Sequence, residues 1–99
     1  MADTGAKIGF VATHYPHAAH QAEFVARVQH AADVLRSTPG CLSADCWLTA
    51  DGDAVVSTAQ WESEEAQAAS LATARAAGVD FDYDERETRP REIIRLVSP

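Results

Sequence analysis

Residues 39–63, PGCLSADCWLTADGDAVVSTAQWES, decide the fold because they combine two strand-forming runs with a turn between them. The runs cover about residues 41–49 and 54–61, and both are rich in residues that favour strands. The Asp51-Gly52 pair favours a tight hairpin turn, since such a turn needs positive backbone φ angles that glycine adopts freely. The stretch therefore predicts an antiparallel β-hairpin.

Helices are expected on both sides of this hairpin. Ser63 is a typical helix N-cap, and the alanine-rich helix that follows it is predicted to end at about residue 77, before Gly78. A first helix is predicted over about residues 18–37, where apolar residues recur at spacings of three and four. This apolar stripe consists of Phe24, Val28, Ala31 and Leu35.

The remaining segments complete one domain, with residues 1–99 as its bounds and a core over about 7–97. Residues 7–14 and 92–97 are predicted strands, and the aperiodic segment 79–91 is predicted to be a loop or a lid. The order β-α-β-β-α-β is typical of an α+β ferredoxin-like fold, in which two helices cover one face of a four-stranded antiparallel sheet.

Alternation along the strands predicts which residues face the helices. On the first strand these are Ile8, Phe10, Ala12 and His14. On the hairpin they are Leu42, Ala44, Cys46, Leu48, Val55, Ser57, Ala59 and Trp61. The opposite, helix-free face carries Val11, Trp47 and Val56, and a homodimer that pairs two such faces would cover them.

The charge balance argues against several classes of partner. The chain carries 8 basic and 15 acidic residues, a net charge of −7, with no basic cluster, so we expect neither nucleic acid nor a membrane as partner. The amino terminus lacks the pattern of a signal peptide, which predicts a cytoplasmic protein. Cys41 and Cys46 are expected to be reduced, because five residues along a strand put them on opposite faces.

Several motifs together resemble the antibiotic biosynthesis monooxygenase (ABM) family. They are Pro16, Glu23-Phe24, TPGCL at 38–42 and QWESEEA at 60–66, and the resemblance covers about residues 7–77. It implies a dimeric α/β barrel with a pocket between helices and sheet in each subunit. It further implies that Trp61 lines this pocket. Members include cofactor-independent oxygenases of aromatic polyketides and quinols, and haem-degrading enzymes.

The sequence departs from the family pattern because it contains no asparagine. Haem-degrading relatives use an asparagine on the first strand, where this chain has Phe10, and a histidine on the second helix, where it has Ser70-Leu71. We therefore do not expect haem degradation. Anthrone oxygenation in the family also uses an asparagine beside the tryptophan, and this chain lacks that residue too.

The resemblance implies a monooxygenase that uses molecular oxygen and no cofactor on an aromatic polyketide, anthrone or quinol-like substrate. His14 is the candidate base, because imidazole titrates near neutral pH, and Trp61 joins it as a catalytic candidate. Phe10, Trp61, Leu71 and Tyr83 are the candidate substrate contacts. The alternatives are an exposed strand-end His14, a Trp61 that only fills the core and a solvated Tyr83.

Two other functions fit the same features: a non-catalytic or regulatory dimer that binds a small ligand, and a polyketide cyclase or isomerase. Arg75 and Arg95 are candidate anion partners, or else surface ion-pair residues. His17 and His20 are one helical turn apart, but no further ligand falls at a metal-binding spacing beside them. We therefore expect no metal site and no flavin.

Overall fold

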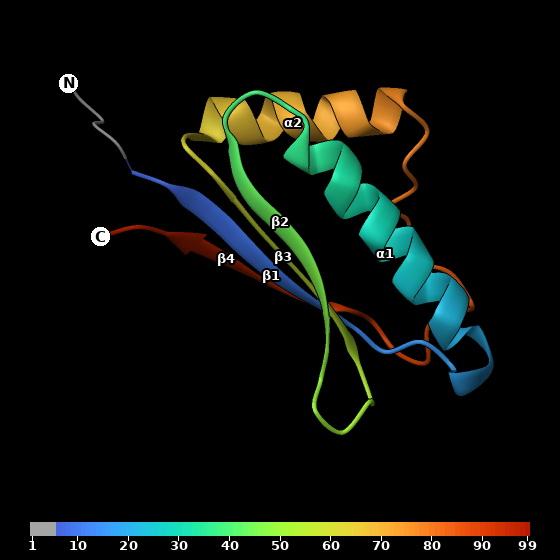
Figure 1. Ribbon diagram of the computed structural model, residues 1–99. Helices are drawn as coiled ribbons and strands as arrows, with labels where there is room; N and C mark the ends of the chain where they lie inside the picture. Colours follow the sequence, from blue (N-terminus) through green and yellow to red (C-terminus); the bar gives the residue numbers. More distant parts are fainter. Residues whose placement is uncertain (1–5) are drawn as a thin grey trace.

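The computed structural model describes residues 6–99 and has the predicted order of elements (Figure 1). Residues 1–5 lie outside the described part. The prediction about a signal peptide rests partly on these residues, and that part of it lies outside the described residues too. The elements are β1 Ile8–His14, the short 3-10 helix η1 Ala18–His20, α1 Gln21–Arg36, β2 Cys41–Leu48, β3 Val55–Trp61, α2 Glu64–Ala76 and β4 Glu92–Val97. The order β-α-β-β-α-β is confirmed.

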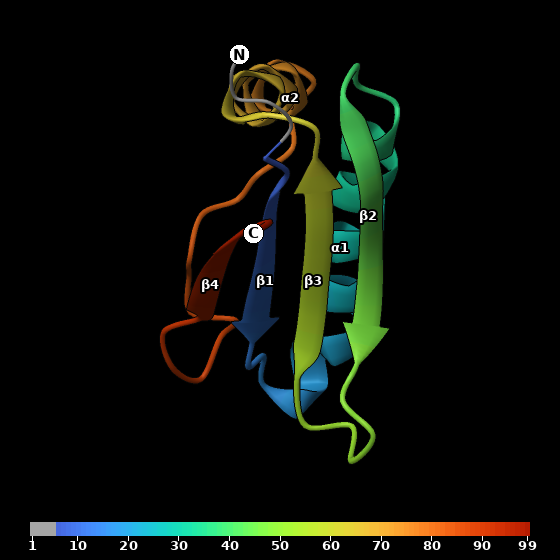
Figure 2. The same ribbon diagram turned by 90° about the vertical axis from the view of Figure 1, so that its left-hand side faces the viewer.

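The four strands form one antiparallel sheet in the order β2-β3-β1-β4. Figure 2 looks onto the face of this sheet that carries no helix, with α1 behind β2 and β3 and α2 across one end. The α+β ferredoxin-like fold is thus confirmed. None of the described helices has the length and apolar character needed to cross a membrane.

The helices begin and end close to the predicted positions. The Ser63 hydroxyl accepts a hydrogen bond from the amide of Ala66 at 3.1 Å, as an N-cap does. Gly78 follows α2 with a φ of 90°, the left-handed conformation that ends many helices. On α1 the buried stripe contains Ala32 where the sequence pattern had Ala31, which is only half-buried.

Two local features of the hairpin differ from expectation. A register shift between Cys41 and Ser43 turns Leu42 out of the helix-facing set, and its side chain is 50% exposed while Cys41 packs on the core. The connection is a loop of several residues in which only Gly52 has positive φ, so it is not the two-residue turn that Asp51-Gly52 suggested. The alternation of residue types could not predict either feature, because a bulge or a longer loop changes the strand pairing without changing that alternation.

The buried side chains form two clusters between sheet and helices. One surrounds the fully buried Trp61 at the end of β3 and includes Leu35 of α1 and Ala74 of α2. The other consists of Phe24, Val28 and Val55. Small residues occupy several helix-facing positions of the sheet: Ala12, Ala44, Ser57 and Ala59, of which Ala44 and Ala59 belong to the first cluster. The large buried side chains are therefore few, with Trp61 in one cluster and Phe24 in the other.

The turn between α1 and β2 depends on Gly40, which leads to a stability prediction. Gly40 has a φ of +81°, and a Cβ there would lie 2.6 Å from the Cβ of Ala66. Gly52 has a similar φ of +76° but open space around it. Gly52→Ala should lower the free energy of unfolding by about 1–2 kcal/mol through backbone strain. Gly40→Ala should lower the free energy of unfolding by about 1–3 kcal/mol more than Gly52→Ala does, because the clash with Ala66 adds to the same backbone strain.

Urea unfolding of the two variants measures this difference directly. Equal losses in Gly40→Ala and Gly52→Ala would show that the contact with Ala66 relaxes without cost. Restored stability in a Gly40→Ala, Ala66→Gly double variant would support the contact as the cause.

Candidate functional site

A cavity of ≈ 690 Å³ lies between the helices and the sheet, in the space that the two core clusters leave between them. Its size is that of a small-molecule site. The sheet contributes a floor of aromatic and small residues, and both helices contribute mainly apolar walls. The apolar lining is made by Phe10, Ala12, Phe24, Val28, Ala31, Ala32, Leu35, Ala44, Ala59, Ala68, Leu71, Phe81 and Ile93.

His14 is the histidine that lines this cavity. It ends β1 on the helix-facing side, its side chain is 9% exposed, and its ring centroid lies 5.2 Å from that of Phe24. Burial lowers the pKa of His14 below its ordinary value, and the positive charges of Arg91 and Arg27 lower it further. The carboxylate of Glu87 opposes this shift. The ring is therefore held in its neutral form, which can accept a proton.

Glu87 and Arg91 complete a buried charge cluster with His14. The Glu87 side chain is fully buried, with Oε1 3.5 Å from Nδ1 of His14, and Arg91 Nη2 donates to its Oε2 at 2.5 Å. Burying these charges is costly unless they are paired. The pair with Arg91 therefore holds the Glu87 carboxylate beside the imidazole, although Nδ1 of His14 and Oε1 of Glu87 form no hydrogen bond.

The segment 79–91 lacks helix and strand yet is tied to the rest of the protein. Glu87 forms an isolated β-bridge with Pro16, and the amide of Thr88 donates to the carbonyl of Tyr15 at 2.7 Å. Arg27 of α1 donates to the carbonyls of Asp80 and Asp82. Sequence reasoning missed Glu87, because the segment is aperiodic and His14 and Pro16, which Glu87 meets, lie about seventy residues earlier in the chain.

The sequence-predicted site residues are only partly brought together. Phe10, His14 and Leu71 line the cavity. Trp61 is fully buried one layer behind it, with its ring edge-on to Phe10 at a centroid distance of 5.5 Å. Tyr83 is 49% exposed and reaches the cavity only through Arg91, whose guanidinium lies 6.0 Å from the tyrosine ring. Direct ligand contact by Trp61 or Tyr83 remains a prediction.

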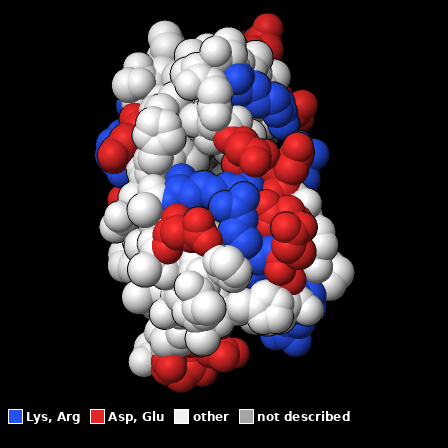
Figure 3. All heavy atoms as spheres, turned by 90° about the vertical axis from the view of Figure 1, so that its right-hand side faces the viewer, with Lys and Arg blue, Asp and Glu red and all other residues white. Residues whose placement is uncertain are grey.

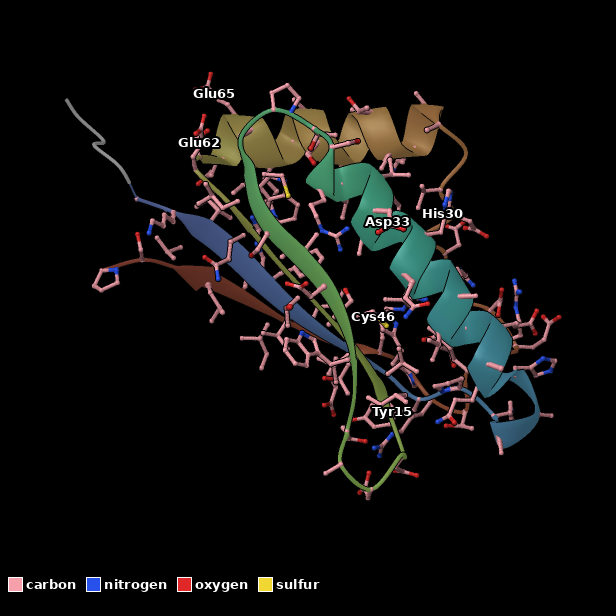
Figure 4. All side chains as sticks on the ribbon, in the orientation of Figure 1. Tyr15, His30, Asp33, Cys46, Glu62 and Glu65 are labelled. Carbon is pink, nitrogen blue, oxygen red and sulfur yellow. The ribbon has the colours of Figure 1, made fainter. Side chains whose placement is uncertain are left out.

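The other reactive side chains form no second centre within residues 6–99. Cys46 points from β2 toward α1, and Figure 4 labels it. Both Cys41 and Cys46 are free, and burial raises the pKa of each thiol. Of the two neighbouring histidines, His20 contacts Glu23 at 2.6 Å, and no group of three potential metal ligands occurs in this part of the chain.

The sequence and the fold agree with one known family. The family model described as "Antibiotic biosynthesis monooxygenase" matches residues 8–77. The chain belongs to the ABM family. None of the curated protein sequences matches the chain significantly.

Solved structures share the ABM fold over nearly the whole chain. Rv0793 of Mycobacterium tuberculosis is 23% identical, with a TM-score of 0.74 and 94% of each chain covered. SnoaB of Streptomyces nogalater, a cofactor-independent oxygenase, is 21% identical, with a TM-score of 0.69 and coverage of 93% and 92%. The monooxygenase ActVA-Orf6 of Streptomyces coelicolor, solved with nanaomycin D, is 25% identical, with a TM-score of 0.66 and coverage of 96% and 88%.

The charge cluster predicts how His14 titrates. An NMR titration of its ring should give a pKa below 6.5, and Glu87→Gln should lower it further because Arg91 and Arg27 then act unopposed. Since the folded-state pKa lies below the unfolded value, the unfolded chain binds the proton first. The free energy of unfolding should therefore fall as the pH drops from 6.5 toward the folded-state pKa.

Glu85→Gln is the matched control, since it removes an exposed carboxylate from the same segment. A His14 pKa above 6.5, or an equal shift in Glu85→Gln, would contradict the role assigned to the cluster.

Proposed function

We propose that the protein is a cofactor-independent monooxygenase that binds a planar aromatic, anthrone-like or quinol-like substrate in the cavity. The observation that carries this proposal is the placement of a buried His14, whose pKa is lowered by burial, at the wall of a large and mainly apolar cavity. Phe10 and Leu71 are the proposed substrate contacts, and Trp61 supports Phe10 from behind. Family membership, and the described activity of the relatives SnoaB and ActVA-Orf6, support the same reaction class.

In the proposed reaction His14 removes a proton from an acidic C–H or O–H of the substrate. The resulting anion is rich in electrons and passes one electron to molecular oxygen, giving a substrate radical and superoxide. These combine into a carbon–oxygen bond, and the peroxide takes back the proton from His14. Loss of water then turns a methylene group into a carbonyl, so that CH₂ and O₂ become C=O and H₂O. The apolar lining excludes bulk water from the reactive anion.

We further propose that the protein forms a homodimer through the helix-free face of the sheet. Trp47 and Ile94 on this face are 57% and 58% exposed, and Leu96 is 47% exposed. The Trp47 indole donates to the Thr58 hydroxyl of the neighbouring strand at 3.1 Å. Burying such a group of large apolar side chains against a second copy would release them from water.

Oxygen uptake with a panel of anthrones and hydroquinones, corrected for uncatalysed autoxidation, tests the proposed reaction. His14→Gln should slow turnover about 100-fold or more and leave ligand binding nearly unchanged, because only the proton transfer is lost. The control is His30→Gln, which removes an exposed imidazole of α1 that Figure 4 labels. Unchanged turnover in His14→Gln would contradict its role as base. Ligand binding by the wild type without any oxygen uptake would favour a binding protein, a cyclase or an isomerase.

Sedimentation velocity tests the proposed dimer. Trp47→Glu should shift the protein toward monomer and lower its melting temperature, since a charge would be buried at the interface. Leu48→Glu is the matched control, because Leu48 lies next in the same strand with a similar exposure of 52%, but its alternation places it on the opposite face. A dimer that survives Trp47→Glu, or dissociates equally in Leu48→Glu, would remove Trp47 from the interface.

A further inference from the structure

Basic side chains gather around the cavity although the protein has a net charge of −7. Half of the eight lysines and arginines in the chain line it: Arg27, Arg75, Arg91 and Arg95. Of fifteen acidic residues in the chain, three are found in the lining within residues 6–99: Asp45, Glu64 and Asp80. Figure 3 shows Lys and Arg atoms at the centre of the side of the molecule that carries α1, with Asp and Glu atoms around them. Basic residues are thus enriched in the lining relative to the whole chain.

Two of these arginines are already occupied within the protein. Arg27 donates to the carbonyls of Asp80 and Asp82, and it lies 3.7 Å from the carboxylate of Asp84. Arg91 pairs with Glu87 and also donates to a backbone carbonyl of the same segment. The positions of Arg27 and Arg91 are therefore explained by their contacts with the segment 79–91.

Arg75 and Arg95 have no such role. Neither forms an ion pair with any carboxylate in the described part of the chain, so the surface ion pairs that the sequence allowed are absent there. Arg75 lies in the last turn of α2 over the ring of Phe81, with its guanidinium 5.4 Å from the ring centroid. Arg95 lies on β4, directly opposite Phe10 in the sheet. Both therefore border aromatic rings of the cavity with hydrogen-bond donors to spare.

Two of the three acidic lining residues lie away from these two arginines, and the third is paired with Arg27. Glu64 begins α2, eleven residues before Arg75, which is about 16 Å along a helix. Asp45 is on β2, three strand spacings or about 14 Å from the strand that carries Arg95. Asp80 already contacts Arg27 at 3.9 Å. Neither Arg75 nor Arg95 is therefore neutralised by an acidic residue of the lining.

We propose that the cavity selects planar aromatic acids, with Arg75 and Arg95 binding the carboxylate or an equally acidic group. The aromatic body would lie among Phe10, Leu71 and Phe81, and the negative charge would point toward β4. Guanidinium groups suit this task because they present paired donors in the geometry of a carboxylate. This inference rests on the proposed function only in placing the ligand in the same cavity, and it holds whether or not the ligand is oxidised.

Matched pairs of charged and neutral probes test the selection: anthraquinone carboxylate against its carboxamide, and naphthoate against naphthamide. Equilibrium dialysis near neutral pH should show the carboxylates binding about fivefold tighter or more, as a charge-assisted pair provides. Added salt should reduce this advantage. Arg75→Gln and Arg95→Gln should each weaken carboxylate binding, and the double variant should remove the preference while still binding the amides.

Arg89→Gln is the matched control, since it removes the same charge from an exposed arginine that contacts Tyr15 and does not line the cavity. Equal binding of each carboxylate and its amide would overturn the selection for acids and leave the cavity as a ligand site. An equal loss in Arg89→Gln would overturn it too, because overall charge would then be the cause. If none of the four probes binds, the cavity itself fails as the ligand site, and the inference fails with it.

Discussion

The site depends on how bulk is distributed along the helix-facing side of the sheet. Trp61 packs against α2 and the end of α1 in one cluster, and Phe24 packs against Val55 in the other. The strands between them carry alanine and serine, which cannot fill the space that these large rings hold open. Protein interiors normally pack as densely as organic crystals, so a cavity of this size needs large side chains that keep the helices away from the sheet. The large ring at the end of β3 therefore makes room for a ligand even though it stands behind the cavity wall.

The electrostatics of the site follow from the way the segment 79–91 is fastened. With neither helix nor strand to satisfy its carbonyls, the segment relies on Arg27 and Arg91 as donors. The same two charges lie close to His14 and, with burial, disfavour its protonated form. The same two arginines therefore hold the segment 79–91 and lower the pKa of His14. A change that freed the segment would also alter the titration of the imidazole.

Much of the fold could be predicted because alternation and helical periodicity are local signals. The helix-facing positions of β1, from Ile8 to His14, follow from parity, and the cap at Ser63 follows from its side chain. Leu42 could not be placed, since a bulge reverses the parity without changing the composition. Nor could Glu87 be assigned to the site. Its partners are set by tertiary packing across most of the chain, and no sequence period records that contact.

Trp61 lies on the predicted face of the sheet but deeper than a residue of the cavity lining. The family resemblance and the strand alternation both indicated a tryptophan on the helix-facing side at the end of β3, and the register confirms that side. Whether a ring on that side meets a ligand depends on what stands in front of it. Here Phe10, one strand over, occupies that place. Parity fixes the face of a side chain but not its depth beneath that face, which only the three-dimensional neighbours decide.

Strand β4 is the element where ligand binding and assembly meet. No helix covers it, and large apolar residues are exposed on both of its faces, with Ile93 at 57% and Ile94 at 58%. Alternation sends Ile93 and Arg95 to the cavity side, and Ile94 and Leu96 to the helix-free face. One six-residue strand can therefore serve the proposed ligand and the proposed partner at once, because each uses every second side chain. A one-residue slip in its pairing with β1 would exchange the two sets, placing Arg95 in the dimer interface without a counter-charge. The cost of burying that unpaired charge would add to the forces that fix the register.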